Sequence, residues 1–384
     1  MMAFSAHLHQ ENPIMLPTKL VIGDLILDLP IIQGGMGVGV SKASLAGAVS
    51  AEGGLGVIAS VGLGEDVASD RSYDERSAEA LRTEIRKVKQ RNLPAGVNVM
   101  VALTNYRSLI QVCIEEGVDA IISGAGLPLR LPGYAGQSAT KLIPIVSSAR
   151  AANIMCNTWM KRYNRLPDAL VVEGPMAGGH LGFKFEELAE GTVEPLEKLV
   201  EHVLNIAQDC RKRYGKEIPV IAAGGIYTGQ DIAKFLSLGA SGVQMGTRFV
   251  ATHECDASDA YKQTFVNSKE DDVIIIRSPV GMPARVLRNE FVERSLHGKK
   301  CSFTCHYKCL LSCEATTANY CIAEVLLNAC RGDFEHGFAM CGQNVHRIDK
   351  IVSVKALIQE LLSGLRSSDS STSPTACGGL RSLL

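Results

Sequence analysis

PVIAAGGIYTGQDIAKFLSLGASGVQMGTRF, residues 219–249, decides the fold class of this chain. Residues 219–223 are a short apolar run that suits a strand buried on both faces, and a glycine pair ends it. Residues 226–238 then have helical spacing, and residues 242–245 form a second apolar run. A strand, a helix and a strand in this order predict two neighbouring parallel strands joined by a crossover helix.

Glycine turns follow both strands: Gly224-Gly225 after the first, and Gly246-Thr247 after the second. Because parallel strands end on the same side, both turns would present bare backbone N–H groups on one rim, where they can bind phosphate. In an eight-stranded α/β barrel, the loops after strands seven and eight often form the phosphate site. The alternative is two ordinary turns, but their spacing by one strand–helix unit favours phosphate binding.

Six further apolar runs of similar length precede this stretch, at residues 30–33, 56–60, 95–100, 120–123, 142–146 and 169–173. Helical segments separate most of them, so the chain predicts an α/β protein, a (β/α)8 TIM barrel. Nearly every strand ends in Gly, Ser or Asn, which suits a site built from all the strand ends. An open doubly wound sheet is the alternative, but it would gather its glycines at one switch point. Residues 20–29 predict a hairpin that plugs the N-terminal mouth of the barrel.

The chain divides into four predicted parts. Residues 16–255 are the barrel, and residues 256–345 are a small, mostly helical, Cys-rich lid or substrate segment that includes an irregular basic stretch at 277–289. Residues 346–362 predict a helix that returns to pack on the barrel. The Ser-rich tail, 363–384, is expected to be disordered.

The composition narrows the class of protein. The 384 residues have a formal net charge of −1 and no basic stripe, so nucleic acid is not an expected partner. No apolar run reaches the ~18–20 residues of a membrane helix, and the N-terminus lacks the features of a secretory signal. The 12 cysteines suit a reducing, cytoplasmic compartment better than a disulfide scaffold. We expect a small-molecule substrate, and a homodimer is one expectation for the assembly.

Residues 173–183, EGPMAGGHLGF, carry the strongest catalytic signal. They follow the sixth strand, so they would lie on the catalytic rim of a barrel. Gly178-Gly179 lets the backbone approach a flat ligand closely, and His180 follows directly. A neutral imidazole at this place can take a proton from carbon. The alternative is a structural histidine that bonds a loop carbonyl.

Five motifs occur in an order that resembles one family: PIIQGGMG, GVNVM, AGGHLG, AAGGI and MGTRF, which begin at residues 30, 96, 177, 222 and 245. Together they resemble the nitronate monooxygenases, formerly called 2-nitropropane dioxygenases. That family includes flavin-dependent enoyl-acyl-carrier-protein reductases and NADH:quinone reductases. The resemblance implies an FMN-binding TIM barrel with a small helical lid, and it implies His180 as the catalytic base on nitronates.

The resemblance also implies which residues bind FMN. The flavin ring would lie along Gln33, Gly34 and Met36, with contacts from Asn98 and Gly179. The remaining cofactor residues are Ser123 and Ala223 at strand ends, with Gly224, Gly225, Gly246 and Thr247 at the phosphate. Many relatives carry a Lys in strand five that touches the flavin, whereas residues 142–147 contain none, and Lys141 precedes the strand.

Three functions remain open at this point. The first is an FMN-dependent oxidoreductase that oxidises nitronates or nitroalkanes with O2. The second is a flavin reductase that uses NAD(P)H as co-substrate and acts on a quinone or an enoyl thioester. The third is a flavin-free barrel that serves as a binding or assembly module, with its cysteines around a structural metal.

The cysteines of the lid are the last unusual feature. Cys305, Cys309 and Cys313 are spaced C-x3-C-x3-C, and Cys321 follows eight residues later. Four-residue spacing would place the thiols on one stripe of a helix, where they could bind Zn or an Fe–S cluster. The alternative is that they are inert, buried cysteines that act as small hydrophobes.

Overall fold

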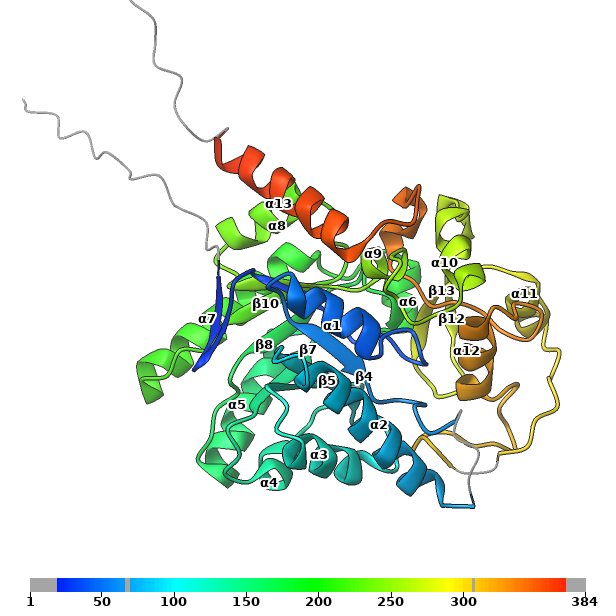
Figure 1. Cartoon of the computed structure of the whole chain (residues 1–384), viewed down its shortest axis with the longest axis horizontal. Helices are drawn as coiled ribbons and strands as arrows, with labels where there is room; N and C mark the ends of the chain where they lie inside the picture. Colours follow the sequence, from blue (N-terminus) through cyan, green and yellow to red (C-terminus); the bar gives the residue numbers. More distant parts are fainter. Residues whose placement is uncertain (1–18, 66–69, 306–307, 371–384) are drawn as a thin grey trace, which may run out of the picture.

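The computed structural model describes residues 19–65, 70–305 and 308–370, and its centre is a barrel of eight parallel strands (Figure 1). The sheet runs in the order β3-β11-β10-β8-β7-β6-β5-β4, and a bridge between Ile32 and Leu55 joins the first strand to the last. The strands are β3 (Ile31–Gln33), β4 (Gly56–Ala59), β5 (Ala95–Met100), β6 (Ala120–Gly124), β7 (Lys141–Val146), β8 (Leu170–Glu173), β10 (Val220–Ala223) and β11 (Gly242–Met245). Each predicted strand is confirmed to within one residue at either end, and the TIM barrel with it.

Helices surround the barrel, and local capping sets where several of them begin. The predicted helix 226–238 is shorter at its start, because Thr228 caps α8 in a reciprocal capping box with Asp231. The same box, made by Ser72 and Glu75, starts α2. The helices are α1 (Ala43–Ala51), α2 (Tyr73–Lys89), α3 (Tyr106–Glu115), α4 (Leu131–Ala135), α5 (Ala149–Tyr163), α6 (Phe185–Ala189), α7 (Leu196–Tyr214), α8 (Gly229–Ser237) and α9 (Thr247–Val250).

Alternation along each strand divides the apolar residues into two layers. One set fills the barrel interior, for example Ile32, Ile143 and Ile221. The hairpin of β1 (Leu20–Ile22) and β2 (Leu25–Leu27) packs on this inner set, so the predicted plug is confirmed.

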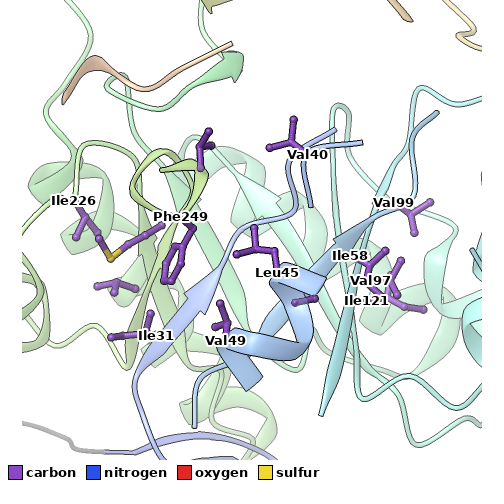
Figure 2. Packing of buried hydrophobic residues seen from close by; sticks show 14 of the residues in the cluster. Ile31, Val40, Leu45, Val49, Ile58, Val97, Val99, Ile121, Ile226 and Phe249 are labelled. Carbon is purple, nitrogen blue, oxygen red and sulfur yellow. The ribbon is translucent and has the colours of Figure 1, made fainter. Parts of the chain in front are cut away.

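The other set lies between the strands and the helices. Figure 2 shows Leu45 and Val49 of α1 between Ile31 and Phe249 on one side and Ile58 on the other. All five side chains are fully buried. This outer layer fixes the strands against the helices, and therefore fixes the loops that follow the strands.

A lid of helices and one small sheet lies at the end of the barrel opposite the plugging hairpin (Figure 1). The stretch 277–289, predicted to be irregular, instead supplies strand β13, which pairs antiparallel with β12 and with the short strand β9. Two prolines and a glycine interrupt the sequence pattern here, although residues 284–287 are all buried in the structure. The lid elements are β9 (Gly179–His180), α10 (Asp259–Val266), η1 (Glu270–Asp272), β12 (Val273–Arg277), β13 (Pro283–Leu287), α11 (Glu290–Leu296), α12 (Ile322–Arg331) and η2 (Gln343–Arg347).

The last helix, α13 (Val354–Ser370), runs beside α8 on the outside of the barrel (Figure 1). The two helices touch closely, since a Cβ on Gly229 would lie 2.1 Å from the carbonyl oxygen of Leu361. The chain therefore returns to pack on the barrel after the lid. The helix extends to Ser370, so the expectation of disorder is wrong for 363–370, and 371–384 lie outside the described residues. None of the helices in the described ranges is long and apolar enough to span a membrane.

Candidate active site

The carboxyl ends of the strands and the lid enclose a cavity of about 470 Å³. Most of the residues predicted for the site line it, and they lie on or just after the strands β3, β5, β9, β10 and β11. They are Gly34, Met36, Asn98, Gly179, His180, Ala223, Gly224, Gly225, Gly246 and Thr247. The structure thus brings together residues that are more than 200 positions apart in the chain.

One end of the cavity is formed by the two glycine turns. Gly224 and Gly225 have φ values of +98° and +83°, which L side chains rarely adopt. A Cβ on Gly225 would lie 2.9 Å from the Cβ of Met176, so the neighbouring turn leaves no room for a side chain. The turns therefore expose backbone where a phosphate could approach.

A segment of the lid closes over these turns, and the sequence patterns did not reveal it. Asn344 donates from Nδ2 to the carbonyl oxygen of Gly225 at 2.6 Å. The N–H of Gly342 donates to Oγ1 of Thr247 at 2.9 Å. These contacts span about a hundred residues of sequence, and no local pattern around residues 342–344 indicated them.

The floor of the cavity carries three polar side chains that point inward from the barrel: Asn98, Glu173 and Gln244. The Oε1 atom of Gln244 is buried and has no hydrogen-bond partner among the described residues. A buried amide oxygen without a partner is costly, so the floor is suited to a ligand that donates to it. Asn98 and Gln244 are both polar residues within otherwise apolar strands, but only Asn98 was predicted for the site.

Glu173 ends strand β8, and its carboxyl faces the cavity. Burial raises its pKa from 4.5 to about 7. No other group contributes to the shift, and no partner for this carboxyl exists in the described part of the chain. The carboxyl is therefore partly protonated near neutral pH.

His180 lies in β9, which the lid strand β13 holds by pairing Ala284 with His180. Its Nε2 is 2.9 Å from Oγ of Ser278, a buried serine at the end of β12 that the sequence patterns did not single out. Burial lowers the pKa of His180 from 6.5 to about 4. The imidazole is therefore neutral at physiological pH, the form that can accept a proton.

Two predicted cofactor residues lie outside the lining, and strand alternation explains both. Ser123 points from β6 toward the helices, where its hydroxyl bonds the carbonyl of Val99 and the hydroxyl of Tyr106. Gln33 is also buried in the wall: its Nε2 donates to the carbonyl of Gly34, and its Oε1 accepts from the N–H of Val57 at 3.1 Å. Both side chains join parts of the barrel wall.

The metal site predicted at Cys305, Cys309, Cys313 and Cys321 stays a prediction, but the helix expected to carry these thiols is not formed by the described residues around them. Residues 308–313 are not helical, because they lie along the β5–α3 loop: the N–H of Leu311 donates to the carbonyl of Ala102 at 2.8 Å. Within the described ranges no group of three or more His, Cys, Asp or Glu side chains could hold a metal ion. Cys309 itself is buried against the cavity, and burial raises its pKa to about 12.

The geometry fits FMN. The glycine turns offer a cradle for its phosphate, and the orphaned oxygen of Gln244 and the amide of Asn98 offer hydrogen bonds to a polar ring. The apolar residues Met36 and Ile145 also border the cavity, so a flat ring would meet both polar and apolar surface.

Comparison with solved structures agrees with the barrel fold. FabK of Thermotoga maritima is 31% identical, with a TM-score of 0.70 over 90% of this chain and 95% of that one. Nitroalkane oxidase of Streptomyces ansochromogenes shares the fold, with a TM-score of 0.68 over 90% of this chain and 98% of that one, at 23% identity. The protein is an FMN-dependent oxidoreductase built on a TIM barrel.

The family follows from the sequence comparisons. The family model for nitronate monooxygenase matches residues 19–364, and the chain belongs to that family. A probable nitronate monooxygenase of Staphylococcus saprophyticus is 29% identical over 304 residues, covering 71% of this chain and 79% of the relative. A hydroxy-methyl-oxo-octahydro-indene-carboxyl-CoA dehydrogenase of Mycobacterium tuberculosis is 30% identical over 274 residues, covering 71% and 67%.

Proposed function

We propose that this protein oxidises nitronates or nitroalkanes with O2, with FMN as its cofactor and His180 as its base. The observation that carries the proposal is the neutral imidazole of His180 in the cavity that the glycine turns line. A nitroalkane must lose a proton from carbon before it can be oxidised, and a buried neutral imidazole can accept that proton. The flavin, when bound, supplies the redox chemistry.

Ser278 orients the imidazole of His180 through the hydrogen bond to its Nε2. If its hydroxyl accepts a hydrogen bond from Nε2–H, the tautomer is fixed and Nδ1 is free to accept a proton. Serine and histidine are held by paired strands, Ser278 after β12 and His180 in β9, with β13 between them. The base is therefore built on a sheet and not on a free loop, which keeps its orientation constant.

The test compares two substrates in the variant His180→Asn. The asparagine keeps a polar side chain but cannot accept a proton near neutral pH. Turnover of a neutral nitroalkane should fall about 10²- to 10⁴-fold, the usual contribution of a positioned base, and turnover of the preformed nitronate should fall less. The FMN content should stay unchanged. His202→Asn, an exposed histidine of α7, is the matched control and should keep both activities.

Other outcomes of this assay would change the proposal. Equal losses on both substrates, with normal FMN content, would show that His180 orients the substrate and does not abstract a proton. No loss on either would remove His180 from the chemistry. Protein that is colourless and takes up no FMN would favour the third function, a flavin-free binding module.

A second function, reduction of an enoyl thioester by NAD(P)H, is favoured by one further observation. The wall opposite the floor is apolar, formed by Leu310 of the lid and by Ile322 and Leu326 of α12. Such a wall suits an acyl chain as well as an alkyl nitronate. Rapid bleaching of the flavin by NADPH or NADH under argon would support this function, whereas bleaching by nitronate alone would support the first.

A further inference from the structure

Arg285 is a buried arginine behind the turn that leads to His180. It lies in β13, and 5% of its surface is exposed. Its guanidinium donates to the carbonyl oxygens of Pro175 at 2.7 Å and of Ala177. Both carbonyls belong to the connection between β8 and β9, so Arg285 holds the backbone immediately before Gly178 and His180.

The charge of Arg285 is not balanced by a neighbouring acid. No carboxylate of the described residues forms an ion pair with the guanidinium, and its Nε has no hydrogen-bond partner there. The nearby thiol of Cys341 cannot balance it, because burial raises the pKa of that thiol to about 12. Burial lowers the pKa of Arg285 itself, but an arginine stays charged at neutral pH.

An isolated buried cation is costly, and proteins keep one where an anion joins it. Two other basic side chains of the barrel, Lys141 and Arg248, are each paired with a carboxylate. Lys141 begins β7, at the opposite end of the strand, and pairs with Asp24 of the N-terminal hairpin. Arg248 lines the cavity but forms an ion pair with Glu360 of α13 at 2.9 Å.

We propose that Arg285 both clamps the 175–177 turn and supplies the positive potential that stabilises negative charge in the cavity, on a nitronate or on the bound flavin. The inference rests on the proposed FMN site. Arg285 acts through the intervening turn and is a positioning and electrostatic residue, not one that touches the reacting atoms.

The experiment separates the charge of Arg285 from its hydrogen bonds. Arg285→Gln keeps a donor and loses the charge, whereas Arg285→Lys keeps the charge. Arg288→Gln is the control, an exposed arginine just past β13 that pairs with Glu293 at 3.4 Å. Each protein is loaded with FMN, its FMN content is measured, and sulfite is titrated against the oxidised flavin band. Sulfite is an anion that combines with oxidised flavin, and its affinity reports the positive potential at the ring.

We expect Arg285→Gln to weaken sulfite binding about tenfold, the order of effect of one charge acting through protein. Arg285→Lys should stay close to wild type, as should the control. Unchanged sulfite affinity in FMN-loaded Arg285→Gln would overturn the inference and leave the proposed function standing. If Arg285→Gln does not fold, Arg285→Lys decides: a tenfold loss overturns the role of the charge, and retention supports it. Wild-type protein that takes up no FMN would overturn the proposed function and this inference with it.

Discussion

Replacing Glu173 with glutamine should stabilise the protein at alkaline pH and leave its stability unchanged at acid pH. The folded state raises the pKa of this carboxyl from 4.5 to about 7, so folding favours the protonated form. The stability that this carboxyl contributes is therefore fully present below pH 4.5, and it is lost as the pH rises toward 7 and above. Each pH unit between the two pKa values is worth about 1.4 kcal/mol, so the ionised carboxyl costs the folded state up to about 3 kcal/mol at alkaline pH.

The assay is urea unfolding of the FMN-free protein at several pH values between about 4 and 8. The free energy of unfolding of Glu173→Gln should exceed that of the wild type by about 3 kcal/mol at the alkaline end, and the two values should be equal at the acid end. Because His180 titrates in both proteins, its contribution cancels in the difference. Glu190→Gln, at an exposed glutamate after α6, should show no such trend. A difference that is constant with pH would show that Glu173 is already solvated or paired, and would refute the reasoning.

Three further outcomes follow from the same geometry. Gly225→Asp and Gly246→Asp should each abolish FMN retention with an unchanged circular dichroism spectrum, because a carboxylate would repel the phosphate and fill the cradle; full FMN content in either would remove the phosphate assignment. Gln33→Leu should lower the free energy of unfolding by about 1–3 kcal/mol, since the N–H of Val57 loses its acceptor, and an unchanged urea midpoint would contradict this. The free energy of unfolding of the wild type should fall relative to that of His180→Asn as the pH drops from 6.5 to about 4, because over this range His180 takes up a proton only in the unfolded chain. Parallel pH profiles of the two proteins would show that the imidazole is solvated in the folded state.

The barrel could be predicted because its signals are local. Each strand is a short apolar run that a Gly, Ser or Asn ends, and helical spacing separates most runs. The stretch 219–249 contains two strands, a helix and both glycine turns within one repeat unit, and the structure places the strands and turns as expected, with the helix beginning three residues later than predicted. The glycine turns could be predicted for the same reason: φ values of +98° and +83° require glycine at residues 224 and 225 whatever the rest of the chain does.

The strand patterns predict where each strand lies in the sequence, but not which of its side chains face the barrel interior and which face the helices. Inward and outward positions alternate along a barrel strand, and Ile122 points inward, so its neighbour Ser123 must point to the helices. The same argument turns Gln33 away from the cavity, because Ile32 fills the interior. Alternation on strands β8 and β11 likewise directs Glu173 and Gln244 to the floor, but apolar residues occupy both faces of these strands, so only the structure shows which face is inward.

The lid could not be assembled from local signals, and it completes the site. Ser278 reaches His180 across 98 positions of sequence, and Arg285 reaches Ala177 across 108. Both contacts exist because β9, only two residues long, adds itself to the edge of the β12–β13 hairpin. A strand of two residues is too short to show the alternation of apolar and polar residues that identifies a strand in a sequence. Pro279 and Pro283 interrupt the same pattern in the β12–β13 hairpin. The barrel therefore supplies the proposed flavin site from local patterns, whereas the roles proposed for His180 and Arg285 depend on how the lid pairs with the strand that carries His180.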